Sequence, residues 1–183
     1  MVPMFIDQDT GRIELPNGFV VTPALDKSGF KGSAFFHLAT PYDYGTPPFQ
    51  WYRLEGGQLD GHMLTISLCF YGKTLVSVHG SINLYPTTPP RWEDGTIEIQ
   101  SEEKRFLDTL LLDALGDPHE RVPTPGDSDL GLDYALSYSY PWGNVWSGYD
   151  GRAGFASIVV TYGSRLEDAQ HDFRKRSQST WRR

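Results

Sequence analysis

The chain has a single cysteine among 183 residues. Cys69 lies in the apolar run 64–70 and has no partner for an intramolecular disulfide, so we expect it to be a small buried side chain. Long apolar runs are also missing, since no run, including that at Leu110–Leu112, is long enough to span a bilayer. The first residues lack a basic segment followed by an apolar one, so no secretory signal is expected. These absences predict a cytoplasmic protein with no membrane partner.

The sequence also lacks the common motifs of catalysis and metal binding. None of the five histidines forms an i,i+4 pair on a predicted helix, and there is no Cys-x-x-Cys, so there is no zinc signature. No phosphate loop and no Gly-x-Ser-x-Gly elbow occurs. The carboxylates available for acid–base chemistry lie beside Gly, Pro or Ser in predicted turns, where Asp is favoured for its backbone hydrogen bonds. We therefore expect no metal, no cofactor and no enzymatic activity.

The charge of the chain is negative and unevenly distributed. The net charge is −7, yet residues 165–183 hold six Arg or Lys against three acids and carry +3, which leaves −10 on residues 1–164. An acidic body argues against nucleic acid as a partner, because phosphate binding needs a basic face. It favours a basic protein partner. The alternative is that the charge only keeps the protein soluble.

The N-terminal third predicts short strands and loops. Residues 11–15 and 19–22 are typical of a small hairpin around the turn Pro16-Asn17-Gly18. Residues 23–48 are loop-like, with a helical or irregular segment within 30–38. Residues 49–54 alternate apolar and polar side chains and predict a strand that ends at Gly56-Gly57.

Two strands in the middle of the chain give the clearest pattern. Residues 61–71 and 74–85 alternate in polarity and are separated by Gly72-Lys73, so they must pair antiparallel. In the first strand, Leu64, Ile66, Leu68 and Phe70 share one face, and Met63, Thr65, Ser67 and Cys69 share the other.

One amphipathic helix is predicted over residues 101–115. Ser101 is placed to cap it and Gly116 to end it. The apolar side chains recur at three- and four-residue spacing and form one stripe that should pack on a sheet: Phe106, Leu107, Leu110, Leu111, Ala114 and Leu115.

The C-terminal part predicts a loop, further strands and a tail. Residues 117–133 form a polar loop with five acids, residues 132–140 a strand, and residues 143–149 and 155–162 a hairpin turned at Asp150-Gly151. Residues 166–176 suggest a short helix, and residues 177–183 a frayed end. The fold class is therefore α+β, a mostly antiparallel sheet with one main helix on one face. We expect a single α+β domain over residues 1–164, followed by the basic C-terminal tail 165–183.

Two segments carry a resemblance to a known group of proteins. Residues 11–19 and 142–163, together with the order of the central strands and the leucine-rich helix, resemble small bacterial immunity proteins encoded beside secreted antibacterial toxins, such as those of type VI secretion. The resemblance implies a cytoplasmic protein that binds a cognate toxin and occludes its active site. It carries no catalytic residue, and the tail beyond Ser164 lies outside it.

A binding surface is predicted where the acidic loop meets aromatic residues of the closing hairpin. Large rigid aromatic side chains are enriched at interface hot spots, and loop carboxylates could face a basic cleft of the toxin. The residues we expect to bind the partner are Asp127, Asp129, Asp133, Trp146, Tyr149, Asp150 and Arg152. The alternatives are a solvated loop with an ordinary turn, a small-ligand-binding or structural accessory domain, and an enzyme of unknown activity.

Overall fold

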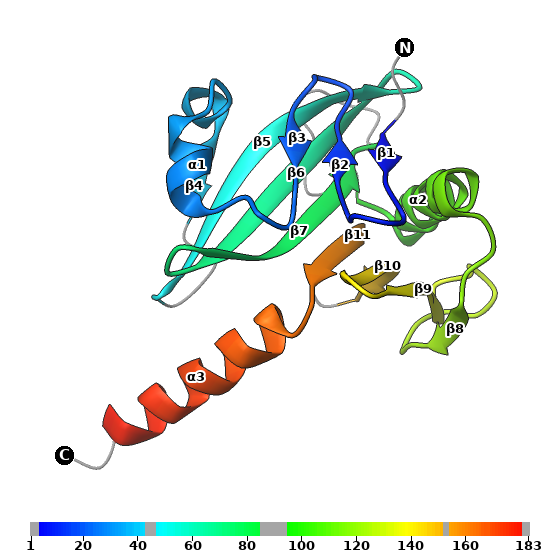
Figure 1. Cartoon of the computed structure of the whole chain (residues 1–183). Coiled ribbons are helices and arrows are strands. Elements are labelled where there is room, and N and C mark those ends of the chain that lie inside the picture. Colours follow the sequence, from blue (N-terminus) through cyan, green and yellow to red (C-terminus); the bar gives the residue numbers. More distant parts are fainter. Residues whose placement is uncertain (1–3, 43–46, 85–94, 152–153, 181–183) are drawn as a thin grey trace.

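The protein consists of two antiparallel sheets and three α-helices, seen in a computed structural model that describes residues 4–42, 47–84, 95–151 and 154–180 (Figure 1). The large sheet has the strand order β4-β5-β6-β7-β11-β10-β9-β8. Its strands are β4 (Thr40–Tyr42), β5 (Phe49–Leu59), β6 (His62–Tyr71), β7 (Thr74–Ile82), β8 (Glu120–Pro123), β9 (Tyr134–Tyr140), β10 (Gly143–Asp150) and β11 (Phe155–Tyr162). The predicted α+β class is confirmed.

The central strands pair as their alternation predicts. β6 and β7 are antiparallel neighbours, and Leu64, Ile66 and Leu68 point into the main core, while Ser67 lies on the opposite face. The predicted end of the preceding strand at Gly56-Gly57 is wrong, because β5 continues to Leu59. The pairing with β6 shifts between Glu55 and Gly57, so the two glycines form a bulge inside a long strand.

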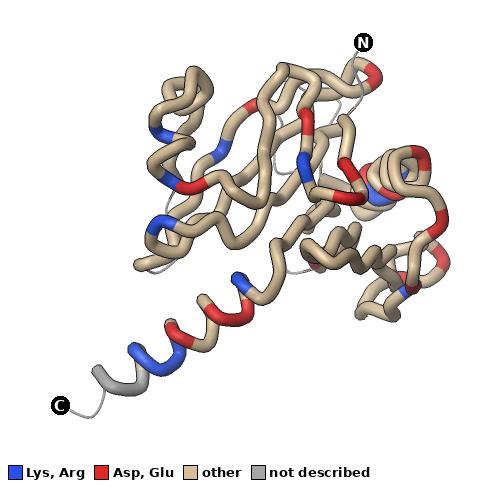
Figure 2. The backbone as a smooth tube through the Cα atoms, in the orientation of Figure 1, with Lys and Arg blue, Asp and Glu red and all other residues tan. Residues whose placement is uncertain are grey.

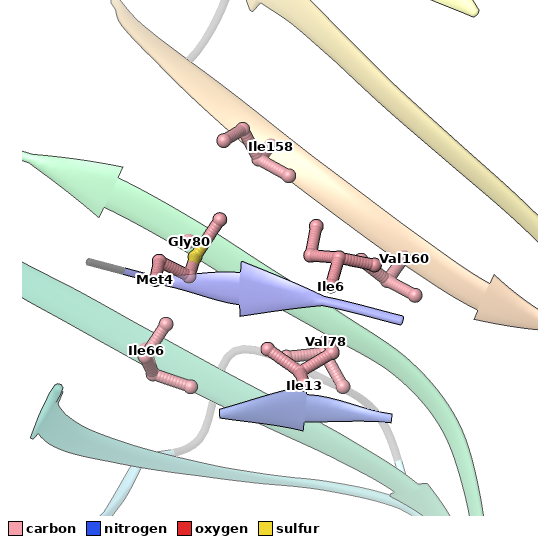
Figure 3. A pocket seen from close by; sticks show the side chains of 8 residues that line it. All are labelled: Met4, Ile6, Ile13, Ile66, Val78, Gly80, Ile158 and Val160. Carbon is pink, nitrogen blue, oxygen red and sulfur yellow. The ribbon is translucent and has the colours of Figure 1, made fainter. Parts of the chain in front are cut away.

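A small sheet covers part of the large one. It is formed by β1 (Phe5–Ile6), β2 (Ile13–Glu14) and β3 (Val20–Val21), of which the β2–β3 hairpin was predicted and β1 was not. Its apolar side chains lie over those of β6, β7 and β11 and leave a void of about 10 Å³ (Figure 3). The void is lined by Met4, Ile6, Ile13, Ile66, Val78, Gly80, Ile158 and Val160. It is too small and too apolar to hold a ligand.

Two further elements pack on the same face of the large sheet. α1 (Lys27–Gly32), followed by a 3-10 turn at Phe36–Leu38, inserts Phe30 against Tyr52 and Phe70, with ring centroids 5.4 and 5.8 Å apart. These elements overlap the segment 30–38, for which the sequence left helix or irregular structure open, and α1 begins three residues before it. We call this side of the large sheet the core face.

The main helix, α2, spans Ile97–Leu115 and packs on β7, β10 and β11 through Leu107, Leu111 and Leu115. Its predicted start at Ser101 is wrong, because Thr96 caps it one turn earlier by accepting a hydrogen bond from the backbone N–H of Ile99 at 3.4 Å. Gly116 ends the helix as predicted, with φ of 78° and its N–H bonded to the carbonyl of Leu112.

The C-terminal half contains one strand that the sequence did not predict. β9, β10 and β11 confirm the predicted strand and hairpin. β8 lies inside the segment that the sequence predicted to be a loop. All four of its side chains are exposed, so the sequence shows no alternation of polarity that would have predicted a strand. It forms only by pairing with β9 at the sheet edge.

The last helix, α3, packs on the other side of the large sheet. It spans Arg165–Thr180, so the predicted frayed end over residues 177–180 is wrong, and the remaining tail lies outside the described residues. Its Ala169 buries Cys69 and Val76, which confirms the buried cysteine, and Phe173 meets Phe49 with ring centroids 5.6 Å apart. Beyond these contacts α3 runs away from the sheets (Figure 1). No helix within the described ranges has the length and apolar character needed to cross a membrane.

Candidate protein-binding face

The side of the large sheet opposite the core face, here called the open face, carries one continuous row of side chains. The strand registers place in this row Arg53, Ser67, His79, Val159, Trp146, Ser137 and Glu120, one from each of seven strands. Among the described elements only α3 packs on this side, and it covers the neighbouring Cys69 and Val76. The part of the open face beside α3 is broad, and most of its side chains in this row are polar.

Trp146 is the largest exposed side chain of this row, with 38% of its surface accessible. Its indole lies over Gly148, where an added Cβ would come within 2.6 Å of Trp146 Cζ3 and 3.6 Å of Ala135 Cβ. Only a glycine leaves room for the ring to lie flat on β10 at this point. The sequence therefore fixes a large aromatic surface that faces solvent.

Two more exposed apolar side chains flank Trp146. Val122 is 36% exposed on β8, where it pairs with Ala135, and Phe155 is 39% exposed at the start of β11, where it pairs with Asp150. Both lie on the open face by the alternation of their strands. We call Val122, Trp146 and Phe155 the apolar strip. Half of the six exposed large apolar side chains in the described part of the chain belong to it.

Acidic residues border one end of the strip. The loop between β8 and β9 holds Asp127, Asp129 and Asp133, and it lies at the end of the sheet where β10 finishes at Asp150. Figure 2 shows acidic residues grouped on the loops beside α2 and β8. Asp127 also organises this loop, since its Oδ1 accepts the N–H of Asp129 at 2.9 Å and of Leu130 at 3.3 Å.

The structure thus brings most of the predicted binding residues to one end of the sheet, but onto two faces. Tyr149 points to the core face, where its hydroxyl donates a 2.6 Å hydrogen bond to Gln100 Oε1 of α2, while Trp146 points to the open face. Arg152 lies outside the described residues. That these residues contact a partner remains a prediction.

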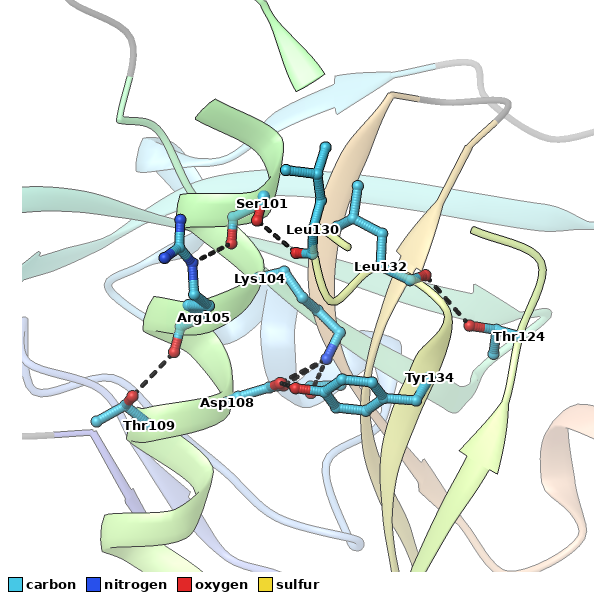
Figure 4. Close-up of polar contacts among 10 residues, drawn as sticks. Ser101, Lys104, Arg105, Asp108, Thr109, Thr124, Leu130, Leu132 and Tyr134 are labelled. Atoms are coloured by element: carbon cyan, nitrogen blue, oxygen red, sulfur yellow. Dashed lines mark hydrogen bonds and ion pairs between the residues drawn. The ribbon is translucent and has the colours of Figure 1, made fainter. Parts of the chain in front are cut away.

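A buried polar network connects α2 to the strands behind the strip (Figure 4). Lys104 is fully buried and its Nζ donates to Asp108 Oδ1 and Oδ2 at 2.7 and 2.6 Å. The Asp108 carboxylate also accepts the hydroxyls of Ser147 and Tyr134, and Lys104 Nζ lies 4.2 Å from the Tyr134 ring centroid. Burial lowers the pKa of the Lys104 ammonium, and the adjacent Asp108 opposes this shift.

Sequence reasoning missed this network and two members of the strip. Lys104 and Asp108 continue the helical spacing of Leu111 and Leu115, so their inward direction could have been read from the helix periodicity. No comparable signal marked Val122, because β8 has no alternation of its own.

A hollow beside α2 has a size that approaches that of a small-molecule site. It has a volume of about 260 Å³ on the outer side of α2 and is lined by Asp60, Arg105, Phe106, Thr109, Leu110 and Asp113. This is slightly below the usual range for ligand pockets, about 300–1,000 Å³. Within the described ranges no three His, Cys, Asp or Glu side chains gather as a metal site would require.

Comparisons with known proteins found a similarity to a solved structure and no family. No family model and no curated protein matches this chain. A chain in a solved structure of Rhs1-CT in complex with cognate immunity protein RhsI1 is similar over 96% of this chain and 98% of that chain, with 14% identity and a TM-score of 0.49. That complex contains the class of protein that the sequence resembles.

Proposed function

We propose that this protein is a bacterial immunity protein that binds a cognate toxin and blocks its active site in the cytoplasm of the producing cell. The observation that carries the proposal is the apolar strip, because a solvent-facing Trp, Phe and Val beside loop carboxylates have no evident role in folding. The sequence resemblance in residues 11–19 and 142–163 supports the same function.

The strip has the composition of an interface centre. Trp is among the residues that most often dominate binding energy, and the surrounding Ser and Thr side chains of the open face could exclude water around it. The indole is already held flat over Gly148, so little side-chain entropy would be lost on binding.

The acidic border suggests which surface of the toxin is covered. None of Asp127, Asp129 and Asp133 forms an ion pair within the described part of the chain, so their field is available to a partner. Opposite charges accelerate encounter and orient the partner. A toxin whose active-site cleft is basic would be drawn to this end of the sheet and occluded. We propose type VI secretion as the route by which such a toxin is delivered.

A titration of toxin activity tests the proposal. The activity of the cognate toxin is assayed with increasing amounts of this protein. A stoichiometric binder protects in proportion to its molar ratio and saturates near equivalence. Full protection at about a hundredth of the toxin concentration would instead show turnover, and no protection at several equivalents would reject the immunity role.

The hollow on α2 supports the second candidate, a small-ligand-binding domain. Arg105, Asp60 and Asp113 line the hollow and offer both charges to a zwitterionic molecule. This function predicts that a ligand raises the melting temperature of the wild-type protein and does not raise that of Arg105→Ala. The immunity function predicts that Arg105→Ala protects against the toxin as well as the wild type.

A further inference from the structure

The open face carries a second feature, at the opposite end of the row from the acidic border. Arg53 is exposed on β5, and its guanidinium carbon lies 5.0 Å from the ring centroid of Tyr42 on β4. No carboxylate among the described residues pairs with it. A guanidinium stacked on an aromatic ring is held in place without losing its hydrogen-bonding edge.

Aromatic side chains form one wall beside this arginine. Trp51 lies 6.0 Å from Tyr42 and 4.9 Å from His79 by ring centroids, the latter pair edge to face. His79 is held by Ser77 Oγ, 3.1 Å from its Nε2, and burial lowers the pKa of His79 to about 4, so the ring is neutral at neutral pH. Among Arg53 and the three rings beside it, Arg53 is therefore the charged group.

We propose that Arg53 binds an aspartate or glutamate side chain of the partner protein, in a site walled by Tyr42, Trp51 and His79. This inference rests on the proposed function and adds the orientation of the partner. Arg53 and Glu120 occupy opposite ends of the row across seven strands, so the Arg53 guanidinium lies far across the open face from the acidic loop. Glu55 is exposed on the same face of β5, and no ion pair joins it to Arg53. A partner that places basic residues at the β8–β9 loop and a carboxylate at Arg53 fits this face in one orientation.

A carboxylate fits the site better than a phosphate. The guanidinium fork can form two parallel hydrogen bonds with either anion, so the charge of the surroundings decides between them. The chain as a whole carries −7, which disfavours polyanions such as nucleic acid. A single side-chain carboxylate is attracted locally without bringing a large negative charge near the acidic loop.

The test is an NMR titration of the full chain with a capped tetraglutamate peptide and, as control, the matching tetraglutamine peptide. We expect saturable shifts of the Arg53 Nε–H and Trp51 Nε1–H signals with the glutamate peptide alone. Arg53→Gln should weaken peptide binding about tenfold or more, Arg53→Lys by less, and Arg174→Gln, an exposed arginine on α3, not at all. Unchanged Arg53 and Trp51 signals at the highest peptide concentration would overturn the site.

A third titration, with inorganic phosphate, tests whether the site binds phosphate rather than a carboxylate. If inorganic phosphate shifts Arg53 at lower concentration than the peptide does, the site is a phosphate site and the proposal is wrong. Because the probe is a peptide, this outcome is independent of the toxin titration. If the toxin binds and the peptide does not, the immunity function stands and the orientation fails.

Discussion

At the scale of single residues, the Lys104–Asp108 pair is the least expected feature of this chain. Burying an ammonium group costs desolvation free energy. For Lys104 this cost is offset by the Asp108 carboxylate, which also accepts hydrogen bonds from two hydroxyls. The pair connects the first half of α2 to β9 and β10, the strands that carry part of the open face. It therefore fixes the positions of β9 and β10 from the core face, on the side of the sheet opposite the apolar strip.

Removing one partner of this pair should strongly destabilise the fold. Lys104→Met leaves the Asp108 carboxylate buried without its cation and should lower the free energy of unfolding by about 3–5 kcal/mol. Lys104→Met combined with Asp108→Leu should recover much of the loss. Urea unfolding measures both, with Arg105→Met at the adjacent exposed position as the control, expected within about 0.5 kcal/mol of wild type. An equal loss in the single and double variants would contradict a paired role.

Glu103 should make stability depend on pH. It is 2% exposed, and its Oε1 accepts the N–H of Leu84 at 3.2 Å. Burial raises the pKa of Glu103 from 4.5 to about 7, while the Leu84 hydrogen bond opposes the shift. The folded state then holds a proton that the unfolded state has released, so the free energy of unfolding falls as the pH rises from about 4.5 to 7.

Comparison with Glu103→Gln isolates this effect. Between about pH 4.5 and pH 7 the wild type should lose on the order of 2–3 kcal/mol relative to the variant. Glu102→Gln, at the exposed neighbouring position, should follow the wild type. Parallel pH profiles for the wild type and Glu103→Gln would show that Glu103 ionises normally in the fold.

At the scale of elements, the sequence predicted the strands and the helix that have a local pattern of polarity. Alternation identified β6, β7, β9, β10 and β11, and periodicity identified α2. The start of α2 was misplaced because both Thr96 and Ser101 can cap a helix, and tertiary contacts direct the Ser101 hydroxyl to the carbonyl of Leu130. β8 could not be predicted, because its existence depends on β9 alone.

The same reasoning explains how much of the candidate site the sequence could predict. Trp146 and the acidic loop were found from composition. Which face each hairpin residue points to was not considered, although alternation separates Trp146 from Tyr149. That Phe155 and Val122 join Trp146 depends on the register of four strands, which residue patterns alone do not give.

α3 should act as a cover over Cys69. Burial raises the pKa of the Cys69 thiol to about 12, and Ala169 of α3 packs against it. Ala169→Glu would force a charge into this contact and loosen the helix. We expect the thiol to react with Ellman's reagent at least about tenfold faster than in the wild type. The control is Gln170→Glu, at the next, exposed position, which should not change the rate. Equal rates for the two variants would mean that α3 does not protect the thiol.

At the scale of the whole molecule, the acidic loop places negative charge at the β8–β9 end of the large sheet. The double variant Asp127→Asn with Asp129→Asn removes two charges and keeps the Oδ1 acceptor that organises the loop. Association with the toxin should slow, and the difference should shrink as salt rises, because exposed charges are screened over about 10 Å at 0.1 M. Stopped-flow kinetics measures the association rate. The control is the double variant Asp9→Asn with Asp113→Asn, which removes the same amount of charge outside the acidic loop. The same deficit in both double variants would assign the effect to net charge.

The central claim is that the apolar strip is the surface that binds the toxin, and calorimetry of the toxin with two truncation variants tests it most directly. Trp146→Ala removes the strip's aromatic centre, and Leu38→Ala removes another exposed apolar side chain, 60% accessible, that lies outside the strip. A hot-spot residue contributes about 2 kcal/mol or more, so Trp146→Ala should weaken binding about 30-fold or more. Leu38→Ala should bind as the wild type does. If Trp146→Ala retains wild-type affinity, the strip is not the binding surface.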